Sequence, residues 1–205
     1  RTELANLLYA AQKKDSGTLI FEGQPIQLNS PRDSLNYGIG LIPEDRKFHG
    51  CILRAGVDFN ITLSVFNKFS RYSLLNKKRL NQIARHYHER LNIRTPSLKQ
   101  KVQFLSGGNQ QKVVVAKTLA SETKVLIFDE PTRGIDVGAK QEIYRIMVDF
   151  VDQGNAIIMI SSEMEELLGM SDRLIVLYEG QKMGEIPKER FNQHDVIDMA
   201  SGNAI

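Results

Sequence analysis

The sequence predicts an α/β fold: a mostly parallel sheet with antiparallel edge strands, plus a helical region. Two short apolar runs, at residues 125–128 and 156–160, are typical of strands covered on both faces. Segments with helical spacing of apolar residues alternate with these runs, and this alternation favours parallel pairing. The third observation is a stretch at residues 57–91 with helical spacing, many basic residues and no strand pattern.

The first part of the chain opens with leucines at helical spacing. Residues 17–21 and 26–28 then predict two short strands around a Glu-Gly turn. Ser30 can cap the short helix that follows, with proline in its first turn. Residues 39–42 predict a short buried strand, and residues 43–46 predict a polar loop.

The basic region has a clear helical stripe, which Asn76 can cap. Its apolar positions are Leu80, Ile83, Ala84, Tyr87 and Leu91. Between Lys68 and Lys101 there are ten Lys or Arg residues and one acid, Glu89. This charge is consistent with a solvated helical face, with a face near anionic lipid, or with a face near an acidic partner.

The second part of the chain alternates between helix and strand. Residues 109–120, 139–151 and 163–168 predict helices around the two apolar runs. Residues 174–178 and 181–186 predict a hairpin around a second Glu-Gly turn.

Composition restricts the possible classes of protein. The 205 residues have 41% hydrophobic and 25% charged side chains, as expected of one globular domain. Cys51 is the only cysteine, which excludes an internal disulfide. No apolar run approaches the length of about 20 residues that crosses a bilayer. The net charge of +3 is too small to indicate nucleic-acid binding by itself.

A serine and two glycines stand directly before a predicted helix, in the run LSGGNQQ at residues 105–111. Glycine lets a backbone approach a ligand closely, and the free N–H groups at a helix start suit a phosphate. The alternative is an ordinary loop that only caps the helix.

Two carboxylates follow the first apolar run, in the sequence VLIFDE at residues 125–130. Ligands of parallel α/β sheets bind at the edge where such strands end. There Asp129 can reach a Mg²⁺ ion, and Glu130 can orient an attacking water. The alternative is a strand that ends in solvated acids.

Together these runs resemble the signature and Walker B motifs of ABC ATPases, and the run RGID at residues 133–136 resembles their D-loop. The runs RTEL, IPEDRK and ISSEM are similar to the C-terminal half of the tandem ATPase subunit of bacterial monosaccharide importers of the ribose, galactose, xylose and arabinose type. The resemblance covers nearly the whole chain. It implies a P-loop ATPase core over residues 1–205, truncated at the Walker A motif, with a helical subdomain at residues 57–104.

Several positions depart from the family pattern. Arg1 stands where the Walker A lysine belongs, and Thr2 where its Mg²⁺-binding hydroxyl belongs. Glu44 replaces the Q-loop glutamine, and Ser162 replaces the switch histidine. Because the signature and Walker B residues are intact, we hypothesise that the signature completes a competent site on the other half. The chain's own site would then bind ATP and hydrolyse it slowly.

The resemblance implies these site residues. Glu130 is the catalytic candidate, and Thr2 and Asp129 are the Mg²⁺ ligands. The ATP-binding candidates are Arg1, Thr2, Glu44, Ser106, Gly107, Gly108, Gln110, Asp136 and Ser162.

The implied function is ATP hydrolysis that energises import of a monosaccharide, at the cytoplasmic face of the membrane. The implied partners are the N-terminal ATPase half, the permease subunits and, indirectly, an extracellular sugar-binding protein. Three alternatives remain at this point: import of a nucleoside or signal molecule, a non-transport ABC ATPase that acts on nucleic acid, and a regulatory module that binds nucleotide without hydrolysis. We expect no nucleic-acid partner, since the net charge is small and there are no coiled-coil heptads.

Overall fold

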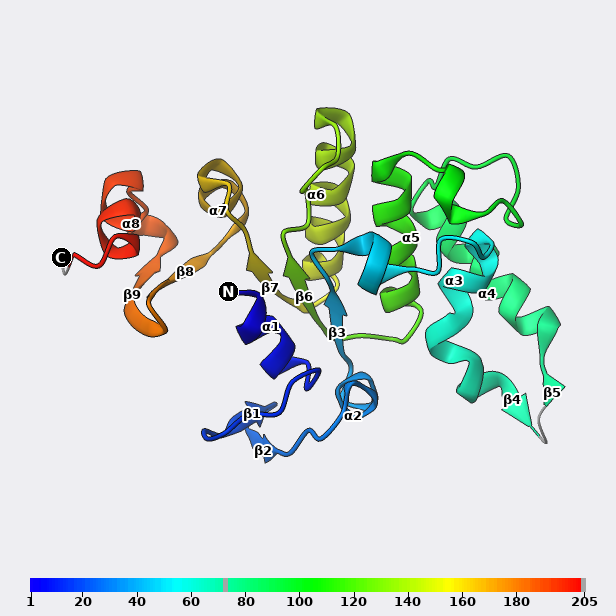
Figure 1. Cartoon of the computed structure of the whole chain (residues 1–205), viewed down its shortest axis with the longest axis horizontal. Coiled ribbons are helices and arrows are strands. Elements are labelled where there is room, and N and C mark those ends of the chain that lie inside the picture. The colour runs from blue at the N-terminus through cyan, green and yellow to red at the C-terminus, as the bar shows by residue number, and fades with distance from the viewer. Residues whose placement is uncertain (72–73, 204–205) are drawn as a thin grey trace.

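The computed structural model describes residues 1–71 and 74–203. Its centre is a parallel sheet in the order β3-β6-β7, as Figure 1 shows. The strands are β3 (Ile39–Ile42), β6 (Val125–Asp129) and β7 (Ala156–Ile160). Ile39 lies opposite Val125, which lies opposite Ala156. The three strands therefore end at one edge of the sheet, and the loops that follow them meet there.

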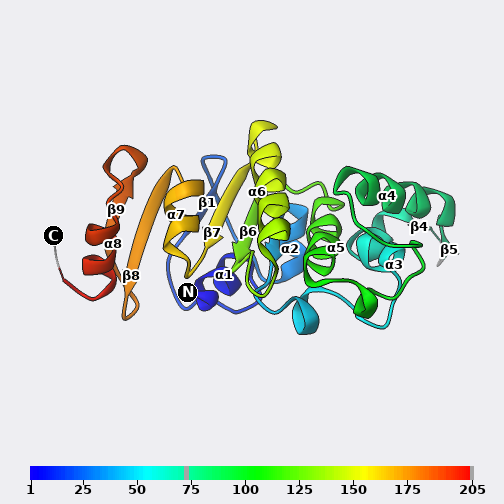
Figure 2. The same cartoon turned by 90° about the horizontal axis from the view of Figure 1, so that it is seen from above.

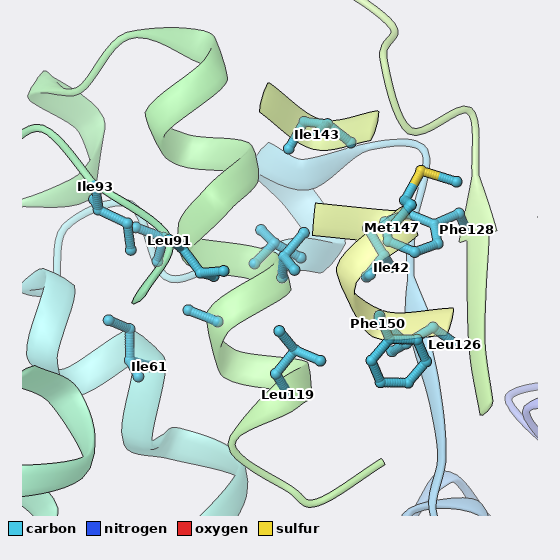
Figure 3. Packing of buried hydrophobic residues seen from close by; sticks show 14 of the residues in the cluster. Ile42, Ile61, Leu91, Ile93, Leu119, Leu126, Phe128, Ile143, Met147 and Phe150 are labelled. Atoms are coloured by element: carbon cyan, nitrogen blue, oxygen red, sulfur yellow. The ribbon is translucent and has the colours of Figure 1, made fainter. Parts of the chain in front are cut away.

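The alternation of side chains along β6 separates two hydrophobic cores. Leu126 and Phe128 face the larger core, whereas Ile127 faces the smaller one. The larger core lies under α5 (Gly107–Leu119) and α6 (Val137–Asp152), and its packing is visible in Figure 3. The smaller core is closed by α1 (Thr2–Leu8), whose Ala5 is 1% exposed. The sheet is thus held from both sides, with α1 on one face and α5 and α6 on the other (Figure 2).

The prediction that residues 156–160 form a strand is confirmed, but the prediction that it is buried is wrong. Ala156 is exposed, and Ile158 is 40% exposed. The reason is that, within the described residues, β7 pairs only with β6 and is the outermost strand of its sheet.

The helical region at residues 57–104 contains α3 (Val57–Thr62), the 3₁₀ segment η2 (Leu63–Phe69), α4 (Lys77–Arg90) and η3 (Val102–Phe104). The predicted cap is confirmed, because the Asn76 side chain accepts a hydrogen bond from the N–H of Arg79 at 3.1 Å. The predicted stripe is confirmed too: Leu80, Ala84 and Leu91 are buried, and Ile83 and Tyr87 are partly buried.

The absence of strands that was predicted for this region is wrong. Two short strands, β4 (Ser70–Arg71) and β5 (Leu74–Leu75), pair antiparallel. The N–H of Asn76 donates to the carbonyl of Phe69, which closes the chain reversal before α4. Residues 72 and 73 belong to the predicted helical region but lie outside the described residues.

Two antiparallel hairpins form separate sheets. The first joins β1 (Leu19–Phe21) to β2 (Gln24–Ile26), and the second joins β8 (Arg173–Tyr178) to β9 (Gln181–Pro187). The second strand begins at residue 24 rather than at the predicted residue 26. Both residues of the Glu22-Gly23 turn have positive φ, which makes a two-residue turn that returns the chain at once.

The remaining elements are short. The predicted loop 43–46 runs directly into a π-helical turn, η1 (Arg46–Gly50). Asp45 caps this turn, because its carboxylate accepts hydrogen bonds from the N–H groups of Lys47 and Phe48. Ser30 caps α2 (Pro31–Asn36) as predicted. The other short elements are α7 (Met164–Met170), η4 (Lys188–Arg190) and α8 (Gln193–Ala200).

Candidate functional site

The end of β6 places two carboxylates at the edge where the parallel strands end. Asp129 is 2% exposed, and its Oδ1 has no hydrogen-bond partner among residues 1–71 and 74–203. Burial raises the pKa of Asp129, the Thr2 hydroxyl lowers it, and the adjacent Glu130 raises it. A buried carboxylate oxygen without a partner, near a hydroxyl, is a donor set that suits Mg²⁺, so these residues fit that ion.

Glu130 follows the strand in a backbone conformation that glutamate rarely adopts. Its φ is +51°, and this left-handed region costs a non-glycine residue about 1–3 kcal/mol. The N–H of Glu130 donates to the carbonyl of Ile160 at 2.8 Å, and the Ser162 hydroxyl donates to the Glu130 carboxylate at 3.0 Å. The acid is therefore held against the loop that follows β7.

Most residues predicted for the chain's own site surround one hollow of about 570 Å³. It is lined by Arg1, Thr2, Glu3, Glu130, Arg133 and Ser162. The Arg1 guanidinium donates to the carbonyl of Ser161 at 3.2 Å, so its charge is directed at a backbone oxygen. The structure thus gathers residues from the start of the chain, the end of β6 and the loop after β7.

Glu44 links two sides of this hollow. Its carboxylate accepts a hydrogen bond from the Thr2 hydroxyl at 3.4 Å and forms an ion pair with the guanidinium of Arg133. A glutamine could not form that ion pair. The departure from the family pattern at this position therefore has a structural consequence, since it ties the loop after β3 to the loop after β6.

The signature residues lie at the start of α5. Ser106 is exposed, and its Oγ accepts a hydrogen bond from the Asn109 side chain at 2.9 Å. Glycine is required at position 108, because a Cβ there would lie 2.4 Å from Cβ of Ala139. A Cβ on Gly107 would lie 2.9 Å from Nη2 of Arg46, so that guanidinium would have to move. No signature residue lines the hollow at Glu130. One domain thus presents two separate surfaces.

Two of the predicted ATP-binding residues make hydrogen bonds within the protein. Gln110 is 6% exposed, and its amide nitrogen donates to the carbonyls of Val102 and Leu105, both at 3.2 Å. It holds the loop before the signature rather than facing solvent. Asp136 caps α6 by accepting a hydrogen bond from the N–H of Ala139 at 2.9 Å. The sequence analysis did not identify Asp136 as a helix cap, although Asp is a preferred residue at that position.

Three residues that the sequence analysis did not single out also contact this region. Arg133 lines the hollow, Arg46 contacts the loop after Glu130, and the Lys140 ammonium donates to both carboxylate oxygens of Glu163 at 2.6 Å. Arg46 and Arg133 belong to runs that carry the family resemblance, which was the available signal.

A sequence profile of the ABC transporter family matches residues 1–133. The chain belongs to the ABC transporter family. Several curated members of the family are close in sequence to this ABC transporter domain. The xylose import ATP-binding protein XylG of Thermoanaerobacter pseudethanolicus is 47% identical over 98% of the chain, and the ribose import ATP-binding protein RbsA of Clostridium perfringens is 45% identical over 98%. The chain spans 40% of the length of each of these two relatives.

Solved ABC transporter structures share the fold. A nucleotide-free ATP-binding cassette superposes with a TM-score of 0.79 over 97% of this chain and 82% of its own, at 20% identity. A dimeric cassette in a post-hydrolysis state with ADP and phosphate gives 0.77 over 93% of this chain and 81% of its own, at 18% identity.

Within the described residues, no helix is both long enough and apolar enough to span a membrane.

Proposed function

We propose that this domain is one nucleotide-binding half of an ATPase subunit that energises monosaccharide import through a membrane permease. The supporting observation is the arrangement at the end of β6. Asp129 ends this strand as a buried carboxylate with an unpartnered oxygen, and the next residue, Glu130, has a left-handed conformation and borders a hollow with Arg1 and Thr2, while the signature glycines lie on a separate surface. The names of the two curated relatives reported above favour a sugar as the imported solute.

Asp129 and Thr2 are the residues that would hold Mg²⁺ with ATP. When bound, that ion neutralises charge on the phosphates. Arg1 provides a positive side chain at the same hollow, and Glu130 is placed to orient a water for attack on the terminal phosphate. In this proposal the amide groups at Gly107 and Gly108 bind the phosphates of the nucleotide held by the other half.

The two nucleotide sites of such a subunit are then unequal. In the chain's own site, Arg1 donates to a backbone carbonyl, Glu44 is engaged by Arg133, and Ser162 occupies the place of the switch histidine while donating to Glu130. Each contact directs a side chain at protein rather than at nucleotide. We therefore assign slow hydrolysis to this site and fast hydrolysis to the site that the signature completes.

We assign contact with the permease to residues 57–104, at the cytoplasmic face of the membrane. A second hollow of about 690 Å³ lies between α1, the loop after β3 and the start of η2. Its walls include Leu63 and Ser64 of this region together with Thr2, Glu44 and Asp129. The region assigned to the permease therefore borders the residues that would hold Mg²⁺.

The experiment that tests the proposed function compares two variants of the whole subunit in proteoliposomes with its permease and sugar-binding protein. Ser106→Arg should lower both ATP hydrolysis and sugar uptake by about 100-fold or more, because it blocks donors that face the transferred phosphate. Gln103→Arg is the control, since Gln103 is an exposed neighbour. Glu130→Gln should remove well under half of the total hydrolysis rate. Full activity in Ser106→Arg would contradict the assignment.

A further inference from the structure

Arg46 occupies a position between the two surfaces of the domain. It is the first residue of η1, two positions after Glu44. Its Nη1 donates to the carbonyl of Arg133 at 2.9 Å, and its Nη2 donates to the carbonyl of Gly134 at 3.1 Å. Both carbonyls belong to the turn that follows Glu130. One planar guanidinium therefore donates hydrogen bonds to the carbonyl groups of two consecutive residues, as its forked arrangement of N–H groups allows.

The backbone of Arg46 is fixed on α5. A Cβ on Gly50, the last residue of η1, would lie 2.8 Å from Cγ2 of Val114, so η1 packs directly on this helix. The ammonium of Lys117, also on α5, donates to the carbonyl of Gly50. The π-helical turn thus has little freedom to move independently of α5.

The guanidinium of Arg46 also contacts the start of the same helix. A Cβ on Gly107 would lie 2.9 Å from Nη2 of Arg46 and 3.1 Å from the carbonyl oxygen of Gly134. The Nε of Arg46 is buried and has no hydrogen-bond partner in the described part of the chain. The group therefore fills the space between the Gly134 turn and the first signature glycine, and it adds positive charge where α5 begins.

A second contact joins the same two loops, and in this one the arginine belongs to the loop after β6. The side chain of Arg133 pairs with Glu44, which also accepts a hydrogen bond from Thr2. Glu44 thus contacts the chain's own site, whereas Arg46 contacts the signature and the turn after Glu130. A shift of the loop that carries both residues would move both surfaces together.

We propose that Arg46 is a positioning residue that couples the chain's own nucleotide site to the signature surface that it offers to the other half. The inference rests on the proposed function, because the signature must act on the opposite nucleotide for the coupling to matter. Arg46 touches neither substrate nor reacting atoms in this account; it acts through the Arg133-Gly134 turn and through Gly107.

The test uses the whole subunit with its permease and measures ATP hydrolysis at several ATP concentrations. Arg46→Ala should lower kcat about tenfold with little change in KM, the loss expected when one charge-assisted contact no longer orders the phosphate donors. Arg46→Lys should restore part of the rate, because an ammonium can still reach one carbonyl. Lys47→Ala is the matched control, since it removes an exposed neighbouring cation of the same helical turn.

A background of Glu130→Gln separates the two nucleotide sites. The hydrolysis that remains in this background belongs to the other half's site, and Arg46→Ala should still lower it about tenfold. Amide hydrogen exchange should become faster at residues 106–109 and 133–136 and stay unchanged in α6, a local effect that global destabilisation would not produce.

The outcomes separate this inference from the proposed function. If the unmodified complex hydrolyses no ATP, the proposed function is wrong. If that complex is active and Arg46→Ala keeps the full rate in the Glu130→Gln background, the coupling role is wrong and the function stands. An equal loss of hydrolysis rate in Arg46→Ala and Arg46→Lys, with uniformly faster amide exchange across the domain, would also overturn the coupling role. That pattern would indicate only a loss of folding stability.

Discussion

The Asp129 carboxylate is buried at the end of β6, and one of its oxygens has no hydrogen-bond partner within residues 1–71 and 74–203. Its neighbour Glu130 has a positive φ, which is unfavourable for a side chain of that size. Both features lower the stability of the folded domain in the absence of ligand. Such features persist where binding or catalysis requires them, which is why these two residues carry the proposed site.

Asp129→Asn should stabilise the ligand-free domain at neutral pH while abolishing its metal site. The pKa of Asp129 is raised above 3.8, so the folded state holds its proton more tightly than the unfolded state. The folded domain therefore loses stability as the pH rises from the ordinary pKa of aspartate through the raised pKa of Asp129, and its stability stays lower above that range. The amide of Asn carries no such penalty. Each kcal/mol gained should raise the Tm at pH 7 by about 2–4 °C in a domain of this size.

Thermal unfolding from pH 7 down to pH 4 measures this effect. The Tm difference between Asp129→Asn and the unmodified domain should shrink as the pH approaches the lower end. Asp149→Asn, at an exposed position on α6, serves as control. A lower Tm for Asp129→Asn at pH 7, or a difference independent of pH, would contradict the role assigned to burial.

Among the elements, those with local causes were predictable. The Asn76 cap, the stripe of α4 and the two Glu-Gly hairpins follow from capping groups, periodicity and turn residues, and all are present. Several features that the sequence did not predict depend on distant contacts. The π-helical turn η1 depends on packing against α5, and the position of Gln110 depends on carbonyls that its amide meets only after folding. The same holds for the site, since the motifs located its residues but not the Glu44–Arg133 ion pair.

Helices α5 and α6 are joined by an ion pair between a buried lysine and a partly buried glutamate, which no sequence pattern predicts. Lys112 is 2% exposed; its ammonium lies 2.7 Å from the carboxylate of Glu142 and donates to the carbonyl of Asn92 at 3.0 Å. Arg94 lies 3.6 Å from the same carboxylate. The pair therefore fixes α5 to α6 and to the segment after α4.

Removing the two partners of this pair should have unequal effects. Glu142→Ala leaves a buried ammonium without its counter-charge and should cost about 3 kcal/mol of unfolding free energy. Lys112→Met replaces that ammonium with an apolar side chain and should cost less. Urea unfolding measures both, with Gln141→Ala at an exposed position as control. A larger loss in Lys112→Met than in Glu142→Ala would show that the buried charge is not what makes the pair necessary.

At the scale of the whole molecule, the domain presents two surfaces with different chemistry. Its hollow gathers side chains that are engaged by other protein groups, whereas the start of α5 keeps exposed Ser106 and two closely packed glycines. In a subunit with two such halves, the first surface would retain a nucleotide and the second would complete the site of rapid hydrolysis. Arg46 connects them, so occupancy of one surface can be transmitted to the other.

The most direct measurement of this asymmetry identifies which nucleotide is cleaved on each half. The whole subunit in its complex is supplied with a photoreactive ATP analogue, trapped with vanadate during turnover and crosslinked; the two halves are then separated by proteolysis. We expect uncleaved triphosphate attached to the half that contains Arg46 and Glu130, and diphosphate attached to the other half. Diphosphate in equal amounts on both halves would contradict it.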